Sequence, residues 1–104
     1  MKVSILDLHC LNAIADDYET VASILEDVRR SSHGNVDATD VTTCMADLVR
    51  DGMADAHRFD PTSGSYEPLS INPAQALGPA QMDTLWFRVN DRGRQQLDEH
   101  WVAE

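Results

Sequence analysis

Apolar side chains recur at helical spacing in three successive stretches of the chain. The first stretch, residues 4–15, carries Ile5, Leu8, Leu11, Ile14 and Ala15 in this spacing. The second, residues 16–30, carries Val21, Ile24, Leu25 and Val28. The third, residues 37–53, carries Val41, Cys44, Met45 and Leu48. Side chains three and four positions apart share one face of an α-helix. The pattern therefore predicts three amphipathic helices, the third of which packs its apolar face against the first two.

The third of these helices has the clearest ends. Asp37 is a natural N-cap, and Asp40 lies three residues later, the spacing of a capping pair. Gly52 is expected to leave the helix in a left-handed conformation, so that Met53 folds back onto the last turn. The sequence thus predicts a helix from about Asp37 to Gly52.

The first two helices carry weaker end signals. Ser4 and Asp7 form a second capping pair at the start of the first helix. Asp16 is expected to cap the second helix, with Glu19 in its first turn, where carboxylates favour the helix dipole. The break between the two helices is therefore expected at Asp16.

After Gly52 the helical spacing stops. Residues 53–59 form a short run that is expected to be a strand, although its alternation is only fair. Residues 60–68 are dense in turn-forming side chains. Residues 72–78 resemble a miniature helix, with Asn, Pro and Gly at the positions where helices start and stop. Residues 84–89 are rich in aromatic and β-branched side chains, and they are the strongest predicted strand.

The end of the chain predicts a last helix beside this strand. Asn90 or Asp91 is expected to cap it, with Leu97 and Trp101 one turn apart on its apolar side. Alternation along the strand places one of Trp86 and Phe87 in the core and the other on the opposite face. The exposed aromatic side chain is a candidate dimer contact.

The net charge of the chain restricts its possible ligands more than its overall composition does. The chain has 104 residues, of which 42% are hydrophobic and 25% charged, as is typical of one folded domain, here residues 1–104. It has 18 acidic against 8 basic residues, a net charge of −10. Such a charge repels polyanions, so it argues against broad binding to nucleic acid or to anionic membranes, but a local basic patch remains compatible with it.

The sequence also indicates a reducing, cytoplasmic setting. Cys10 and Cys44 are the only cysteines, and they lie among helical apolar residues without metal-binding or redox spacing. Polar residues interrupt what would have to be a signal peptide, and no window approaches the roughly 20 apolar residues of a membrane span. We therefore expect a cytoplasmic protein without membrane contact.

Candidate metal and catalytic groups are scattered rather than spaced as sites. The four histidines are His9, His33, His57 and His100, and no pair has the spacing of a zinc or calcium motif. The residue types of a catalytic triad are present in Ser63 or Ser65, His57, and Asp55 or Asp60. No nucleophile elbow accompanies them. We expect no metal, no cofactor and no enzymatic activity.

The outward side of the third helix is the candidate binding surface. Opposite the apolar stripe lie Thr39, Thr43, Ala46 and Arg50, flanked on one side by Asp40 and Asp47. Threonine can contact thymine methyl groups and arginine can bind guanine. The alternative is a solvated helix face with no ligand. Arg29, Arg30 and Arg58 could hold phosphates, or could instead offset a helix dipole or pair with nearby carboxylates.

Two local motifs carry a resemblance to a known family. The run VTTCMADLVRDGM, residues 41–53, resembles a recognition helix followed by the first strand of a wing. The run WFRVNDRGRQQL, residues 86–97, resembles the second wing strand and the helix after it in MarR-like and PadR-like regulators. In this order the two runs are similar to the winged helix-turn-helix superfamily of transcription regulators over residues 4–102.

The resemblance implies an α+β fold: a three-helix bundle, a two-stranded β wing hairpin with a long insertion, and a C-terminal helix. In that family the third helix enters the DNA major groove and the wing contacts the backbone or minor groove. The resemblance therefore implies a dimeric regulator that binds double-stranded DNA, with one subunit per half-site. The residues expected to contact DNA are Thr39, Thr42, Thr43, Arg50 and Arg58.

The chain departs from the family at the wing. Residues 60–67 carry two acids and no base, and the interval 60–83 is long for a wing. Family members that bind DNA usually bring several Lys or Arg from the third helix and the wing. The alternative hypothesis is an acidic winged helix that does not bind DNA and instead docks a basic protein partner.

Overall fold

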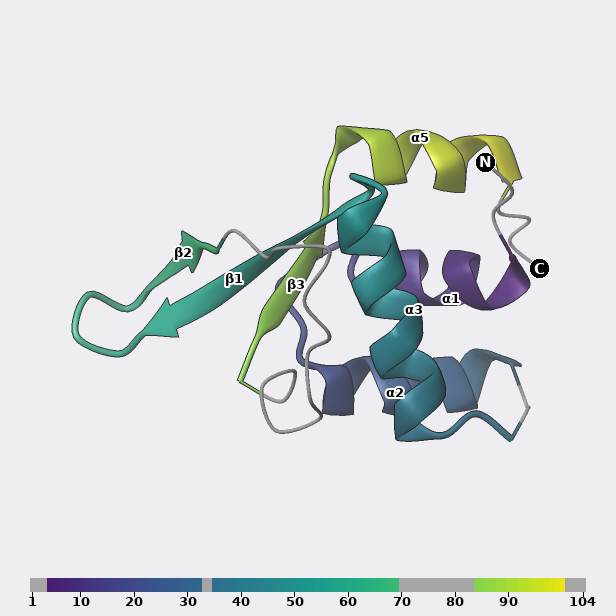
Figure 1. Cartoon of the computed structure of the whole chain (residues 1–104), viewed down its shortest axis with the longest axis horizontal. Helices are drawn as coiled ribbons and strands as arrows, with labels where there is room; N and C mark the ends of the chain where they lie inside the picture. The colour runs from purple at the N-terminus through teal and green to yellow at the C-terminus, as the bar shows by residue number, and fades with distance from the viewer. Residues whose placement is uncertain (1–3, 33–34, 70–83, 101–104) are drawn as a thin grey trace.

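A computed structural model describes residues 4–32, 35–69 and 84–100. These residues form an α+β fold in which helices pack against one antiparallel sheet (Figure 1). The elements in chain order are α1 (Ile5–Ala13), α2 (Val21–Ser32), α3 (Ala38–Arg50), β1 (Ala54–Asp60), β2 (Ser65–Pro68), β3 (Trp86–Val89) and α5 (Asp91–His100). The expected short helix at 72–78 lies outside the described residues.

The predicted ends of α3 are confirmed. The Asp37 carboxylate accepts a hydrogen bond from the Asp40 N–H at 2.9 Å, and the Asp40 carboxylate accepts one from the Asp37 N–H at 3.2 Å. At the other end Gly52 has φ +78°, and the Met53 N–H donates to the Leu48 carbonyl at 2.9 Å. This closure turns the chain directly from α3 into β1. The capping box predicted for α1, Ser4 with Asp7, is also present.

The predicted start of α2 is wrong. Asp16 does not cap it; the helix begins at Val21, and the Thr20 hydroxyl oxygen accepts a hydrogen bond from the Ser23 N–H at 3.3 Å. The reason is a backbone pairing between the α1–α2 link and β3. The Glu19 N–H donates to the Phe87 carbonyl at 2.9 Å, and the Phe87 N–H donates to the Glu19 carbonyl at 2.7 Å. These two bonds hold Glu19 in an extended conformation outside the helix.

The sheet has the strand order β2-β1-β3, and all pairs are antiparallel. The expected pairing of the segment after Gly52 with residues 84–89 is confirmed, with Ala54 opposite Val89 and His57 opposite Trp86. The prediction of only two strands is wrong, because β2 pairs with the outer half of β1. Its turn-forming composition is overridden by cross-strand contacts, since the ring of Tyr66 packs on that of Phe59.

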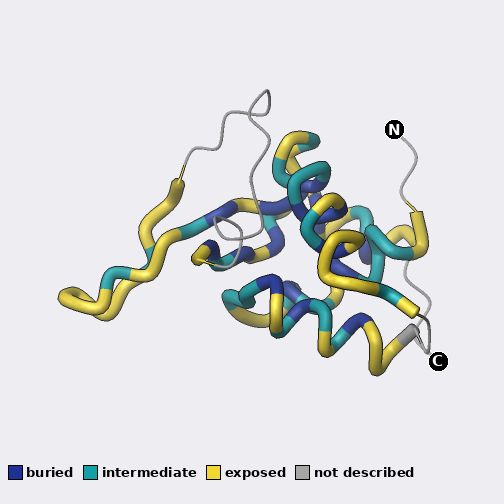
Figure 2. Tube along the Cα trace, turned by 60° about the horizontal axis from the view of Figure 1, so that its bottom comes forward, coloured by how far each residue is buried: buried dark blue, intermediate teal, exposed yellow. Residues whose placement is uncertain are grey.

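The core lies where α1, α2, α3, α5 and one face of the sheet meet (Figure 2). Phe87 is fully buried there, whereas Trp86 is only half-buried on the opposite face, as strand alternation predicts. The buried apolar residues are Cys10, Leu11, Ile14, Val21, Ile24, Val28, Val41, Cys44, Met45, Leu48, Met53, Ala54, Ala56, Leu85, Phe87, Val89 and Leu97. Trp101, predicted to pack beside Leu97, lies outside the described residues.

Asn90 and Gly93 position α5. The Asn90 side-chain oxygen accepts from the Gly93 N–H at 3.0 Å, and its amide group donates to the Gly52 carbonyl at 2.8 Å. Asn90 therefore caps α5 and ties it to the end of α3. A Cβ on Gly93 would collide with the Met53 carbonyl oxygen and lie 2.7 Å from a Val89 methyl group. The close approach of this helix requires glycine here.

Within the described ranges, no helix is both long enough and apolar enough to cross a membrane.

Candidate nucleic-acid interface

Helix α3 presents its small polar residues to solvent. Its buried face consists of Val41, Cys44, Met45 and Leu48. On the other side Thr39, Thr43 and Arg50 are exposed, while Thr42 and Ala46 are half-buried. We call Thr39, Thr43, Ala46 and Arg50 the α3 strip. The structure thus brings the predicted helical contact residues onto one accessible surface, with Thr42 at its margin.

Arg50 lies between two carboxylates. Its guanidinium is 3.0 Å from a carboxylate oxygen of Asp47 and 3.4 Å from one of Asp51. The Arg50 side chain is 51% exposed. Ion pairs this accessible are each worth about 0–1 kcal/mol, because water and salt screen them. The pairs therefore neutralise Arg50 in the free protein without holding it firmly.

A shallow pocket of about 360 Å³ beside the α3 strip is acidic. Its lining residues are Ser4, Leu6, Asp7, Asp40, Thr43, Cys44 and Asp47. The Cys44 thiol donates to the Asp7 carboxylate at 3.0 Å. Hydrogen bonding with Cys10 and burial raise the pKa of Cys44, so this thiol stays protonated and inert at neutral pH. The carboxylates, not the sulfur, define the chemistry of the pocket.

Arg58 stands on the hairpin formed by β1 and β2. It follows Ala54 and Ala56 at every second position of β1, and because these two residues face the core, the Arg58 side chain lies on the same side of the sheet as α3. Its guanidinium is 3.6 Å from the Glu67 carboxylate of the neighbouring strand, and the two side chains are 69% and 50% exposed. Arg58 is therefore on the α3 side of the hairpin, but it is paired there with an acid.

The tip of the hairpin is an acidic turn closed by hydrogen bonds to Asp60. The Asp60 carboxylate accepts from the Thr62 N–H at 2.9 Å and from the Ser63 hydroxyl at 3.1 Å. The hydrogen bond from Thr62 is the largest cause that lowers the pKa of Asp60. Gly64 completes the turn with φ +71°. The hairpin tip therefore presents a fixed carboxylate and no cation.

The arginines at the end of α2 have local partners. The Arg29 Nε donates to the Val36 carbonyl, which precedes α3, at 2.7 Å. Arg30 pairs with Glu26 at 3.2 Å and with Asp27 at 3.7 Å. These contacts fit the alternative interpretation of Arg29 and Arg30 as structural rather than phosphate-binding residues.

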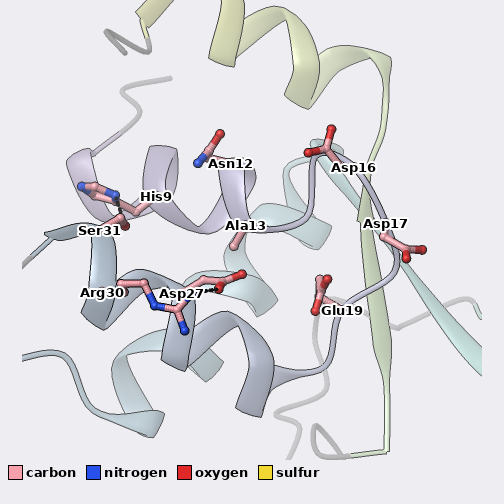
Figure 3. Close-up of a pocket in the computed structure, with 9 residues that line it drawn as sticks. All are labelled: His9, Asn12, Ala13, Asp16, Asp17, Glu19, Asp27, Arg30 and Ser31. Atoms are coloured by element: carbon pink, nitrogen blue, oxygen red, sulfur yellow. Dashed lines mark hydrogen bonds and ion pairs between the residues drawn. The ribbon is translucent and has the colours of Figure 1, made fainter. Parts of the chain in front are cut away.

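A second pocket, of about 410 Å³, lies between α1, α2 and their link (Figure 3). It is lined by His9, Asn12, Ala13, Asp16, Asp17, Glu19, Asp27, Arg30 and Ser31. The His9 Nδ1 and the Ser31 hydroxyl are 2.9 Å apart. Burial, together with repulsion from Asp27, raises the pKa of Glu19. Among the residues that the structure describes, no group of three or more His, Cys, Asp or Glu side chains could hold a metal ion.

Sequence reasoning missed an aromatic cluster on the other face of the sheet. The cluster consists of Tyr18, His57, Phe59, Tyr66 and Trp86, and we call it the outer aromatic cluster. Alternation in the segment 54–60 could have indicated a face with His57 and Phe59. The contribution of Tyr66 could not be anticipated, because it depends on the strand β2 that the turn-rich composition conceals.

No protein-family model, no curated protein and no solved structure matches this chain.

Proposed function

We propose that this protein is a winged helix regulator that binds double-stranded DNA, with the α3 strip in the major groove and the hairpin as its wing. One observation carries the proposal: the outward face of α3 offers Thr39, Thr43 and Arg50 beside a projecting hairpin (Figure 1). The small side chains allow close approach to base edges. Arg58 lies on the α3 side of that hairpin, where it would reach a phosphate.

The ion pairs of Arg50 are a weak obstacle to this role. Arg50 gives up contacts with Asp47 and Asp51 that are worth about 0–1 kcal/mol each. A bidentate contact with guanine is worth about 1–3 kcal/mol of discrimination, which is enough to offset the loss of these pairs. The net charge of −10 acts mainly at long range, and salt at physiological ionic strength screens it beyond about 8 Å.

A second candidate function is an interaction module that docks a basic segment of another protein. The observation that favours it is the acidic border of the α3 strip, made by Asp40, Asp47 and Asp51. Carboxylates beside a groove attract Lys and Arg side chains and repel phosphates at short range. The two functions therefore predict opposite consequences when these acids are neutralised.

The proposal includes a homodimer in the cytoplasm. A two-fold dimer would place its two α3 helices about 34 Å apart, so that they meet successive major grooves. A reducing compartment is supported by Cys10 and Cys44, which are both free, buried thiols.

The test is a selection of bound sequences from a random duplex library at about 50 mM salt, where phosphate contacts are strong. We expect enrichment of a half-site. Arg50→Ala should then weaken binding to that site about 5-fold to 150-fold, because a base contact of about 1–3 kcal/mol is lost. Arg30→Ala is the matched control, since it removes the same charge from a pocket that α1, α2 and their link form without α3.

Two outcomes would contradict DNA binding. One is a library with no enriched sequence. The other is an equal loss of affinity in Arg50→Ala and Arg30→Ala, which would indicate a general charge effect instead of recognition by α3. Binding of a Lys- and Arg-rich peptide that Asp47→Asn weakens would support the second candidate.

A further inference from the structure

The outer part of the β1–β2 hairpin lacks the support of a third strand. Strand β3 pairs with β1 only over residues 54–57, whereas β2 pairs with residues 57–60. The hairpin therefore projects beyond the helices (Figure 1), and its outer residues are largely exposed (Figure 2). A two-stranded hairpin is marginally stable in water on its own. Some other contact must fix its direction relative to α3.

The outer aromatic cluster lies where that contact is needed. The rings of Tyr18 and Tyr66 stack with centroids 4.0 Å apart and an interplanar angle of 8°. Tyr66 also lies 5.3 Å from Trp86 of β3 and 5.1 Å from Phe59 of β1. Aromatic pairs of this kind contribute about 0.5–1.5 kcal/mol each beyond their buried area. Tyr66 is thus the residue of β2 that connects the hairpin to the rest of the molecule.

Tyr18 is anchored to the helical body. It belongs to the α1–α2 link, and the next residue, Glu19, exchanges two backbone hydrogen bonds with Phe87. The rings of His57 and Tyr18 pack at an interplanar angle of 84° with centroids 4.8 Å apart. The guanidinium carbon of Arg88 lies 5.2 Å above the Tyr18 ring, within the range of a cation–π contact. Tyr18 therefore contacts one side chain from each of the three strands: Arg88 of β3, His57 of β1 and Tyr66 of β2.

We propose that the Tyr18–Tyr66 stack is a strut that holds the hairpin in a fixed orientation to α3, and that both tyrosines are positioning residues for the hairpin. The strut acts on the face of the sheet opposite Arg58, so it can set the position of Arg58 without touching a ligand. The consequence for DNA affinity rests on the proposed function. The rigidity of the hairpin does not rest on it.

The test compares Tyr66→Ala with Tyr66→Phe by hydrogen–deuterium exchange of the full chain. We expect the hairpin amides beyond Ala56 to exchange at least about 10-fold faster in Tyr66→Ala, because the stack and its two flanking ring contacts are lost. Amides of α2 and α3 should keep their protection. Tyr66→Phe keeps all three ring contacts and should match the parent protein.

Tyr18→Ala is the second variant, and it removes the strut from the helical side. It should loosen the same hairpin amides as Tyr66→Ala. Unchanged hairpin exchange in both alanine variants, or a parallel loss of protection in hairpin and helices, would overturn the strut. If a duplex is selected, both alanine variants should weaken its binding and Tyr66→Phe should not. Absence of any bound duplex would refute only the proposed function, since the exchange result is measured without DNA.

Discussion

At the scale of single residues, two glycines show how differently the same residue type is constrained. Gly93 has an ordinary backbone conformation, but the space for a side chain is occupied by the Met53 carbonyl and by Val89. Gly64 is in the left-handed region at φ +71°, and a Cβ there would meet nothing within 4 Å. The first position is therefore constrained by packing and the second by backbone conformation alone.

This contrast gives a prediction for stability. Gly93→Ala should lower the free energy of unfolding by about 3 kcal/mol, because α5 must move away from Met53 and Val89. Gly64→Ala should cost roughly 1 kcal/mol, the strain of a left-handed alanine. Urea unfolding of both variants measures the difference. Equal losses would contradict the close packing of α5.

At the scale of secondary-structure elements, local signals predicted the helices and long-range contacts decided the rest. The caps of α1 and α3, the left-handed Gly52 and the strand around Phe87 could all be predicted, because each depends on neighbours within a few residues. The start of α2 and the existence of β2 could not. Both depend on partners distant in sequence, Phe87 for Glu19 and β1 for β2.

The same limit applies to the candidate site. Helical periodicity predicted that Thr39, Thr43 and Arg50 face outward, and they do. The pairing of Arg58 with Glu67 follows from the register of β2, which the sequence did not reveal. The position of Tyr18 over the sheet follows from another long-range contact, the backbone pairing of Glu19 with Phe87. The residues on the outward face of α3 could therefore be predicted, but the ion-pair partners of the arginines could be predicted only in part.

The corrected start of α2 can be tested directly. Thr20→Ala removes the side-chain oxygen that accepts from the Ser23 N–H, and should cost about 1 kcal/mol of unfolding free energy. Asp16→Ala, at the cap that the sequence alone predicts, should have little effect. Thermal unfolding of the two variants distinguishes them. A larger loss of stability in Asp16→Ala than in Thr20→Ala would instead support Asp16 as the N-cap of α2.

At the scale of the whole molecule, charge is the dominant feature. Eighteen acidic against eight basic residues give a net charge of −10 on 104 residues. The ion pairs described above are exposed and do little to offset this excess. Repulsion among the acidic side chains should therefore destabilise the folded chain. Repulsion between the acidic protein and the DNA phosphates should also restrict any attraction to short range.

This repulsion predicts a stabilising effect of salt. Raising sodium chloride from about 20 mM to about 500 mM should increase the thermal unfolding midpoint, because the screening length shortens to a few Å. The increase should level off as screening becomes complete. A midpoint that falls with added salt would show that attractive ion pairs outweigh the repulsion.

The most direct measurement of the central claim is the affinity of a selected duplex for Arg50→Ala and Asp47→Asn, measured side by side. If α3 binds DNA, Arg50→Ala weakens the complex. Asp47→Asn strengthens it instead, because that substitution removes one of the two ion pairs of Arg50 and a carboxylate beside the phosphates. If both substitutions leave the affinity unchanged, or if Asp47→Asn weakens it, α3 is not the DNA-binding surface.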